Sequence, residues 1–126
     1  MKAAFIEKTG GPEEIQYGEF SDLVPTAGHV LVRISAVSVN PIDTYIRGGL
    51  VAMKLSMPFI VGSDFAGIVE AVGEGVTQWK IGDRVWGANQ GGHGRQGTFA
   101  DMACVNQEWL HAIPEGIKEE DAAAVA

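Results

Sequence analysis

Apolar and polar residues alternate along several short stretches of the chain, as they do in strands that bury one face. The longest such run is residues 29–39, which place one apolar set on a common face: Val30, Val32, Ile34 and Ala36. Residues 65–72 are instead apolar on both faces apart from Glu70, a pattern typical of a strand covered on two sides. We expect these two runs to form the central strands of the fold.

Five shorter segments, separated by turns rich in glycine and proline, are also predicted to be strands. They are residues 2–7, 15–20, 84–86, 98–105 and 109–113. Gly67 lies inside a central strand, where a missing side chain usually marks a close approach of two backbones. Val76, Trp79 and Ile81 are expected to form an apolar underside. Short strands joined by tight turns predict a mainly β domain, a small and partly open barrel.

Two segments are predicted to be helical. Asn40 can cap a helix over residues 41–47, with Asp43 in its first turn and Gly48-Gly49 as its stop. This short helix would project from the end of the longest strand. Residues 119–121 are acidic and precede a run of alanines, which indicates a second helix start. Because that helix has no polar or basic end, we expect residues 1–126 to be the first part of a longer protein.

Size and charge exclude several functions. The chain has 126 residues, enough for one core, and its formal net charge of −7 argues against binding nucleic acid or anionic membrane surfaces. It has a single cysteine, so no internal disulfide forms, and no apolar run reaches the roughly 18–20 residues of a membrane span. We expect a cytoplasmic protein. An exposed alanine helix and an uncovered barrel edge would favour a homodimer or larger assembly.

Neither a metal site nor a dinucleotide-binding loop is predicted. His29, His93, His111 and Cys104 have no paired ligand spacing, and Cys104 is expected to be a small core residue. Residues 92–97 match the G-x-G-x-x-G spacing, but strand-like residues follow them. A dinucleotide loop needs a helix there, whose N-terminus holds the pyrophosphate. These residues are therefore interpreted as a surface hairpin.

The candidate site lies on the short helix. Asn40 and Tyr45 at a barrel rim can hydrogen-bond a polar ligand, and Arg47 and Asp64 can join them there. A purely structural interpretation is equally open, since capping alone accounts for Asn40 and Asp43. Asp64 can likewise be a turn residue, because glycine and serine precede it.

Three motifs together resemble the medium-chain dehydrogenase/reductase superfamily, in its quinone oxidoreductase, or zeta-crystallin-like, branch. They are Val37-Ser-Val-Asn-Pro-Ile-Asp-Thr-Tyr-Ile-Arg-Gly48, Gly62-Ser-Asp-Phe-Ala-Gly-Ile-Val-Glu-Ala-Val-Gly73 and Gly82-Asp-Arg-Val85. The resemblance implies that residues 1–126 form the GroES-like catalytic domain, and that a Rossmann domain binding NADPH follows. It also implies hydride transfer to a quinone or conjugated enone in the cleft between the two domains.

The resemblance further assigns roles to single residues. Zinc-dependent members carry cysteine at the position of Asn40 and histidine at that of Ser63, so a zinc-free enzyme is implied. Catalytic positions facing the nicotinamide would be Asn40, Asp43 and Tyr45, with Arg47, Ser63 and Asp64 also lining the cleft. One departure is Leu50-Val51, where relatives often place a tyrosine, and it leaves the proton donor open. The alternative is a free-standing barrel that acts as a non-catalytic binding module, with residues 87–97 as its interaction loop.

Overall fold

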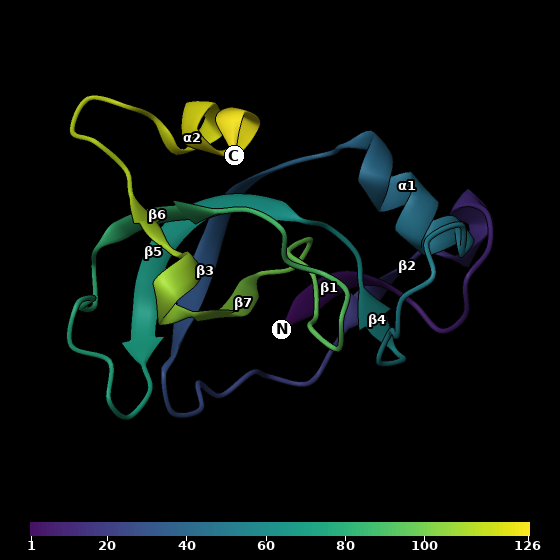
Figure 1. The fold of residues 1–126 in the computed structure, drawn as a ribbon, viewed down its shortest axis with the longest axis horizontal. Helices are drawn as coiled ribbons and strands as arrows, with labels where there is room; N and C mark the ends of the chain where they lie inside the picture. The colour runs from purple at the N-terminus through teal and green to yellow at the C-terminus, as the bar shows by residue number, and fades with distance from the viewer.

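The computed structural model describes residues 1–126 as two antiparallel sheets and two short helices (Figure 1). The strands are β1 (Lys2–Ile6), β2 (Gln16–Glu19), β3 (His29–Ser38), β4 (Phe59–Ile60), β5 (Asp64–Val72), β6 (Arg84–Gly87), β7 (Met102–Asn106) and β8 (His111–Ala112). The helices are α1 (Pro41–Gly48) and α2 (Glu119–Val125), with 3-10 turns η1 (Pro12–Glu14) and η2 (Gln107–Trp109). Neither helix has the length and apolar character needed to cross a membrane.

The larger sheet has the order β7-β3-β5-β6-β8 and is built on the two predicted central strands. Val30 and Val32 are fully buried, which confirms the alternation read from the sequence. Gly67 pairs with Ile34, and a Cβ atom there would collide with the carbonyl oxygen of Arg33, so the predicted close backbone approach is confirmed. The same ladder sets Ser38 opposite Asp64 and so brings the end of β3 to the start of β5.

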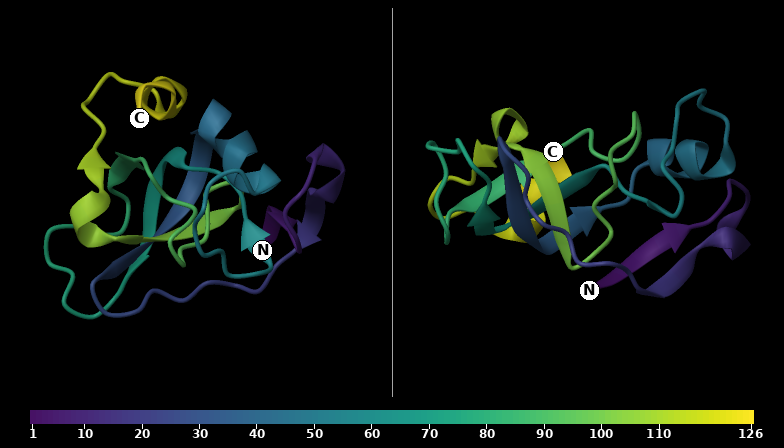
Figure 2. Two further views of the ribbon diagram at one scale, coloured as in Figure 1. Left: turned by 45° about the vertical axis from the view of Figure 1, so that its right-hand side comes forward. Right: turned by 90° about the horizontal axis from the view of Figure 1, so that it is seen from below.

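The smaller sheet, β2-β1-β4, meets the larger one through residues 98–101. The N–H of Ala4 donates to the Phe99 carbonyl at 2.8 Å, and the N–H of Ile34 donates to the Asp101 carbonyl at 2.9 Å. Figure 2 shows the two sheets side by side without closure into one cylinder. The prediction of a mainly β, partly open barrel is confirmed.

Two apolar clusters support the region that carries α1. The main core lies in the larger sheet around Phe65 and Val85, both fully buried. A second cluster joins Ile46 of α1 to Ile6, Phe59 and Val61. Because Ile46 is 6% exposed, α1 is anchored to the smaller sheet along one face.

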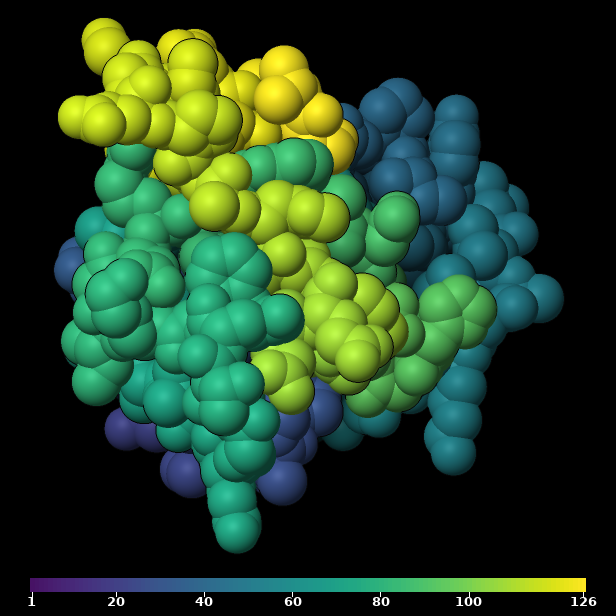
Figure 3. Space-filling model, turned by 60° about the vertical axis from the view of Figure 1, so that its left-hand side comes forward, coloured from purple at the N-terminus to yellow at the C-terminus, as the bar shows by residue number.

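The alanines of α2 are buried within the chain itself. Ala122 and Ala123 are 4% and 1% exposed and pack against Ala66 and Ile113. Figure 3 shows the C-terminal residues, in yellow, covering one end of the molecule. The expected exposed alanine face is therefore wrong, because β5 and the segment after β8 cover it.

Several sequence-based boundaries are also corrected. The strand expected over residues 98–105 begins only at Met102, since the preceding residues bond to both sheets. Trp109 belongs to η2 rather than to a strand, because the Asn106 side chain accepts the Glu108 N–H at 2.9 Å and caps a turn there. Ile81 is 70% exposed at a turn, whereas Val76 and Trp79 pack on the core as expected. Cys104 is only partly buried, and that burial raises the pKa of its thiol.

Candidate functional site

The first turn of α1 fixes two of the predicted site residues. Asn40 occupies the N-cap position with extended backbone angles, and Pro41 begins the helix. The Asp43 carboxylate accepts the backbone N–H of Asn40 at 2.8 Å. Gly49 ends the helix in the left-handed region, at φ 83°. The predicted cap and stop are thus confirmed, and they hold Asn40 and Asp43 on one side of the helix start.

Ser63 and Asp64 reach the same place from the start of β5. Gly62 precedes them with φ 110°, and a side chain there would collide with the ring of Phe99. The Ser63 hydroxyl donates to Asp43 Oδ1 at 3.0 Å. The Asn40 side-chain amide donates to Asp64 Oδ2 at 2.7 Å. We call Ser38, Asn40, Asp43, Ser63 and Asp64 the polar cluster.

The two carboxylates of the polar cluster are both largely buried, at 7% exposure each. Burial raises the pKa of Asp43 above its usual range, and the nearby Asp64 charge adds to the rise. Hydrogen bonds from the Asn40 N–H and from Ser63 oppose it by favouring the ionised form. The net direction is upward, so Asp43 holds a proton more tightly than an exposed aspartate does.

Two predicted residues make no hydrogen bond to this cluster, although Arg47 lines a pocket with Asp43. Tyr45 is 48% exposed, and its hydroxyl makes no hydrogen bond within the chain. Arg47 turns toward the N-terminal segment, where its Nε donates to the Gly10 carbonyl at 3.1 Å. At the position of the missing tyrosine, Leu50 is 79% exposed and Val51 packs on the cluster of Ile46 and Phe59. Neither side chain can donate a proton.

Three neighbours of the site were missed in the sequence. The Ser38 hydroxyl donates to the Ala123 carbonyl at 2.9 Å and lies 3.4 Å from Asp64 Oδ2. The buried Thr98 hydroxyl donates to the Asp64 carbonyl at 3.0 Å, and the N–H of Gln90 donates to the Ser63 carbonyl at 3.0 Å. Of the three, only Ser38 could have been suggested by the sequence, because it lies at the end of the longest alternating run. Thr98 and Gln90 lie in a loop whose position relative to the site no local sequence pattern predicts.

The remaining chemistry-bearing residues do not form a metal site or a dinucleotide-binding loop. Nowhere in residues 1–126 do three His, Cys, Asp or Glu side chains come together in a way that could hold a metal ion. Gly92 pairs with Arg95 in an isolated bridge, and the chain then continues toward β7 with no helix after it. This confirms the hairpin interpretation of residues 92–97.

Fold and site together define a class of protein. A partly open antiparallel barrel carries a buried polar cluster where β3 leads into a short capped helix, and this is the architecture of a GroES-like domain with a site at its rim. Residues 26–115 match the alcohol dehydrogenase GroES-like domain family. The chain belongs to that family, within the medium-chain dehydrogenase/reductase superfamily.

Its relatives include quinone oxidoreductases. The chain is 37% identical to the quinone oxidoreductase of Sus scrofa over 126 residues, which are 99% of the chain and 37% of that protein. The structure of a Pseudomonas syringae quinone oxidoreductase is similar with a TM-score of 0.89 at 34% identity, covering 98% of the chain and 36% of that protein. The Escherichia coli quinone oxidoreductase in complex with NADPH gives 0.87 at 35%, with coverages of 98% and 36%. The chain thus spans little more than a third of the relatives that it matches.

Proposed function

We propose that this chain is the substrate-binding domain of a zinc-independent, NADPH-dependent oxidoreductase that reduces quinones or conjugated enones. The observation that carries the proposal is the polar cluster, in which Asn40 is bonded to Asp64 and Ser63 to Asp43. These residues occupy the family motif, and relatives named quinone oxidoreductase match nearly the whole chain.

The donor set of the polar cluster fits the uncharged end of a nicotinamide cofactor. Its free donor is the second N–H of the Asn40 amide, since both serine hydroxyls already donate within the chain, and its two carboxylates are unsuited to phosphate. In the proposed enzyme the phosphates would be held by a further domain outside residues 1–126. When bound, NADPH would supply the hydride, and the residues of this chain would position the acceptor.

Asn40 would orient the acceptor. Asp64 is an acceptor when ionised, so it fixes the amide with Nδ2 toward the carboxylate. The second N–H and the carbonyl of Asn40 then have a defined direction at the end of β3. A fixed hydrogen-bond donor of this kind polarises a carbonyl oxygen without having to reorganise during the reaction.

Asp43 and Ser63 would supply the proton that must accompany the hydride. Ser63 Oγ donates to the ionised Asp43 Oδ1 at 3.0 Å; when Asp43 is protonated, the bond would reverse, so that the Asp43 proton passes to Ser63 Oγ while the Ser63 hydroxyl proton goes to the substrate and Asp43 is left ionised. Burial favours the protonated Asp43, which supports this role. The pair would replace the tyrosine that Leu50-Val51 lacks.

The test uses the complete protein with NADPH and a simple quinone. Asn40→Ser is expected to lower kcat/KM roughly tenfold to a hundredfold, which corresponds to about 1–3 kcal/mol for a lost positioned hydrogen bond. Ser35→Ala, on the exposed face of β3, is the matched control and should leave kcat/KM unchanged. Unchanged kinetics in Asn40→Ser would leave Asn40 with a structural role only, and one zinc per chain in elemental analysis would contradict the zinc-independent assignment.

A further inference from the structure

Two consecutive carbonyl groups where the chain enters β5 are held by one loop, residues 88–98. The N–H of Gln90 donates to the Ser63 carbonyl at 3.0 Å, and the Thr98 hydroxyl donates to the Asp64 carbonyl at 3.0 Å. The side chains of Ser63 and Asp64 make the central hydrogen bonds of the polar cluster. The loop therefore holds the backbone on which both of these side-chain bonds depend.

The end of the loop lies directly on the chain that leads into β5. The N–H of Gly97 donates to the Ile60 carbonyl at 2.8 Å, and the N–H of Phe99 donates to the Val61 carbonyl at 3.0 Å. A Cβ atom on Gly97 would collide with the Ile60 carbonyl oxygen, so only glycine allows this close approach. Thr98 lies between these two bonds and is fully buried, with its side chain against the start of β5.

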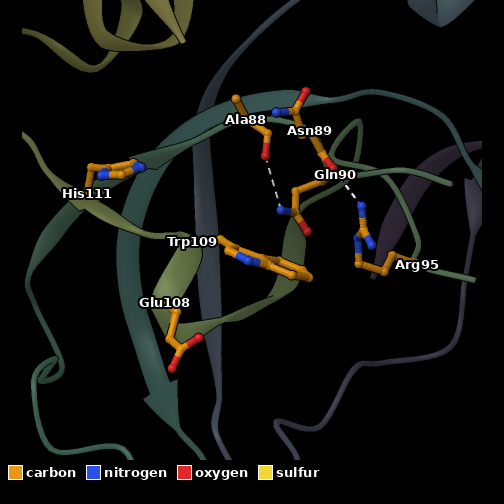
Figure 4. A pocket seen from close by; sticks show the side chains of 7 residues that line it. All are labelled: Ala88, Asn89, Gln90, Arg95, Glu108, Trp109 and His111. Atoms are coloured by element: carbon orange, nitrogen blue, oxygen red, sulfur yellow. Dashed lines mark hydrogen bonds between the residues drawn. The ribbon is translucent and has the colours of Figure 1, made fainter. Parts of the chain in front are cut away.

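The rest of the loop is held by its own side chains (Figure 4). Gln90 Nε2 donates to the Ala88 carbonyl at 3.2 Å, and Arg95 Nη2 donates to the Asn89 carbonyl at 2.9 Å. The Arg95 guanidinium also lies over the Trp109 ring, 4.7 Å from the ring centroid. Because these contacts hold the loop independently, loss of its one hydroxyl bond to β5 should leave the loop itself in place.

Packing alone does not account for a threonine at position 98. A fully buried hydroxyl is costly unless it makes a hydrogen bond, and valine would fill nearly the same space without that cost. The hydroxyl of Thr98 donates to the Asp64 carbonyl. The contribution of threonine over valine at this position is therefore its bond to Asp64.

Asp64 is also the residue whose side chain orients Asn40. Asp64 Oδ2 accepts the Asn40 Nδ2–H at 2.7 Å and lies 3.4 Å from the Ser38 hydroxyl. With its backbone carbonyl held by Thr98, the Asp64 carboxylate stays within reach of the Asn40 amide. A donor that is fixed before the reaction stabilises developing charge better than one that must reorganise.

We propose that Thr98 is a positioning residue for the reduction: its hydroxyl holds Asp64, and Asp64 in turn orients the Asn40 amide toward the acceptor. The part of this inference that concerns the reaction rests on the proposed function. Thr98 acts through Asp64 and needs no contact of its own with substrate or cofactor.

The direct measurement is the NMR signal pair of the Asn40 side-chain amide in the ¹⁵N-labelled complete protein, assigned by its loss in Asn40→Ser. Thr98→Val removes the hydroxyl and should move both signals, whereas Thr98→Ser keeps the hydroxyl and should restore them. The control is Thr26→Val, which removes a hydroxyl contact to His29 in the turn before β3 and should leave both signals in place. Unmoved signals in Thr98→Val, or equal movement in Thr98→Ser, would overturn the proposal.

A kinetic cycle tests the connection to the reaction. Thr98→Val should lower kcat/KM with NADPH and a simple quinone about tenfold, and Thr98→Ser should recover most of it. In an Asn40→Ser background, Thr98→Val should cost less than about twofold, because the group through which it acts is gone. Equal losses in the two backgrounds would overturn the proposal. No effect of Asn40→Ser alone would contradict the proposed function instead, and the amide signals would then decide whether Thr98 positions Asn40.

Thr98→Cys covers the case in which Thr98→Val does not fold. A thiol is similar in size to a hydroxyl but is only a weak hydrogen-bond donor. Thr98→Cys should therefore move the Asn40 amide signals while the fold is kept. Asn40 signals that stay in place in folded Thr98→Cys would overturn the proposal.

Discussion

The side-chain amide of Asn40 donates a 2.7 Å hydrogen bond to Asp64, and this bond joins the start of α1 to the start of β5. A helix cap alone needs no such contact, because capping uses the backbone of the helix itself. The bond spans 24 residues of sequence and connects two family motifs. It therefore gives Asn40 a structural role in the polar cluster in addition to its N-cap position.

The Asn40–Asp64 hydrogen bond predicts that Asn40→Asp and Asn40→Ser differ in stability, a difference that capping alone does not predict. Asparagine, aspartate and serine cap about equally well. Asn40→Asp, however, would set a carboxylate against Asp64, and we expect it to lower the free energy of unfolding by about 1–3 kcal/mol. Asn40→Ser only loses the bond and should cost about 1 kcal/mol. Urea unfolding at neutral pH measures both.

Tyr45→Phe is the control for this pair, since the Tyr45 hydroxyl makes no hydrogen bond within the chain. It should change stability by less than about 0.5 kcal/mol. If Asn40→Asp unfolds at the same urea concentration as the unmodified protein, the bond contributes nothing to stability.

The raised pKa of Asp43 predicts a pH dependence with a definite sign. The folded protein binds the Asp43 proton more tightly than the unfolded chain does, so this residue contributes stability that is complete below the unfolded pKa of about 3.9. The contribution is lost as the pH rises through the higher folded pKa. Asp43→Asn cannot titrate, and its stability relative to the unmodified protein should rise over the same pH range.

The measurement for Asp43 is urea unfolding of the unmodified protein and of Asp43→Asn at a series of pH values from below the unfolded pKa to neutrality. The free energy of unfolding of Asp43→Asn minus that of the unmodified protein should increase as the pH rises. Parallel curves would mean that Asp43 has the same pKa folded and unfolded. Asp43→Asn should also reduce turnover in the complete protein if the proposed proton path is used.

Gly67 is expected to be irreplaceable even by alanine. Its Cβ would collide with the Arg33 carbonyl and approach a methyl group of Val32 to 2.8 Å, in the centre of the larger sheet. Gly67→Ala should lower the free energy of unfolding by about 2 kcal/mol or more, since β3 and β5 must separate to accept the methyl group. Gly18→Ala in β2 is the matched control, because no atom lies within 4 Å of its Cβ position. Equal stability of the two variants would contradict the close approach.

How far the sequence predicted this fold depends on how local each signal is. The alternation of β3, the cap and stop of α1 and the glycine inside β5 are consequences of neighbouring residues, and the structure confirms all three. Residues 98–101 join two sheets, and their bonds to Ala4 and Ile34 depend on partners 95 and 67 residues away in the sequence. Periodicity carries no information about such partners.

The candidate site likewise combines residues that local sequence patterns predicted with contacts between distant segments that they did not. The positions of Asn40 and Asp43 at the helix start were predicted from capping chemistry, Asp64 was expected at the same rim, and Ser63 came from the family motif. The burial of Asp64, and its contacts with Ser38 and Thr98, follow from the crossing of β3, β5 and the loop after residue 97. Tyr45 and Arg47 were included because the short helix was expected to present its side chains at the rim, and the family motif also pointed to Tyr45. Tyr45 is 48% exposed, whereas Arg47 lies one turn after Asp43 on the same helix face and lines a pocket with it.

The hydrogen bond from Ser38 to Ala123 predicts that loss of the Ser38 hydroxyl loosens the packing of α2 on the larger sheet. Ser38 Oγ donates to the Ala123 carbonyl at 2.9 Å and is also within 3.4 Å of Asp64, so it connects α2 to the polar cluster. Ser38→Ala should increase the hydrogen-exchange rates of the α2 amides severalfold while lowering the global free energy of unfolding by only about 1 kcal/mol. Local opening is expected to dominate because α2 is short and its other anchors are the small alanine contacts with Ala66 and Ile113 and the ion pair of Glu119, its first residue, with Arg84 at 2.7 Å. Ser35→Ala on the same strand should leave α2 exchange unchanged. If Ser38→Ala alters exchange evenly across β3, β5 and α2, the serine acts on the whole fold and does not specifically hold α2 against the site.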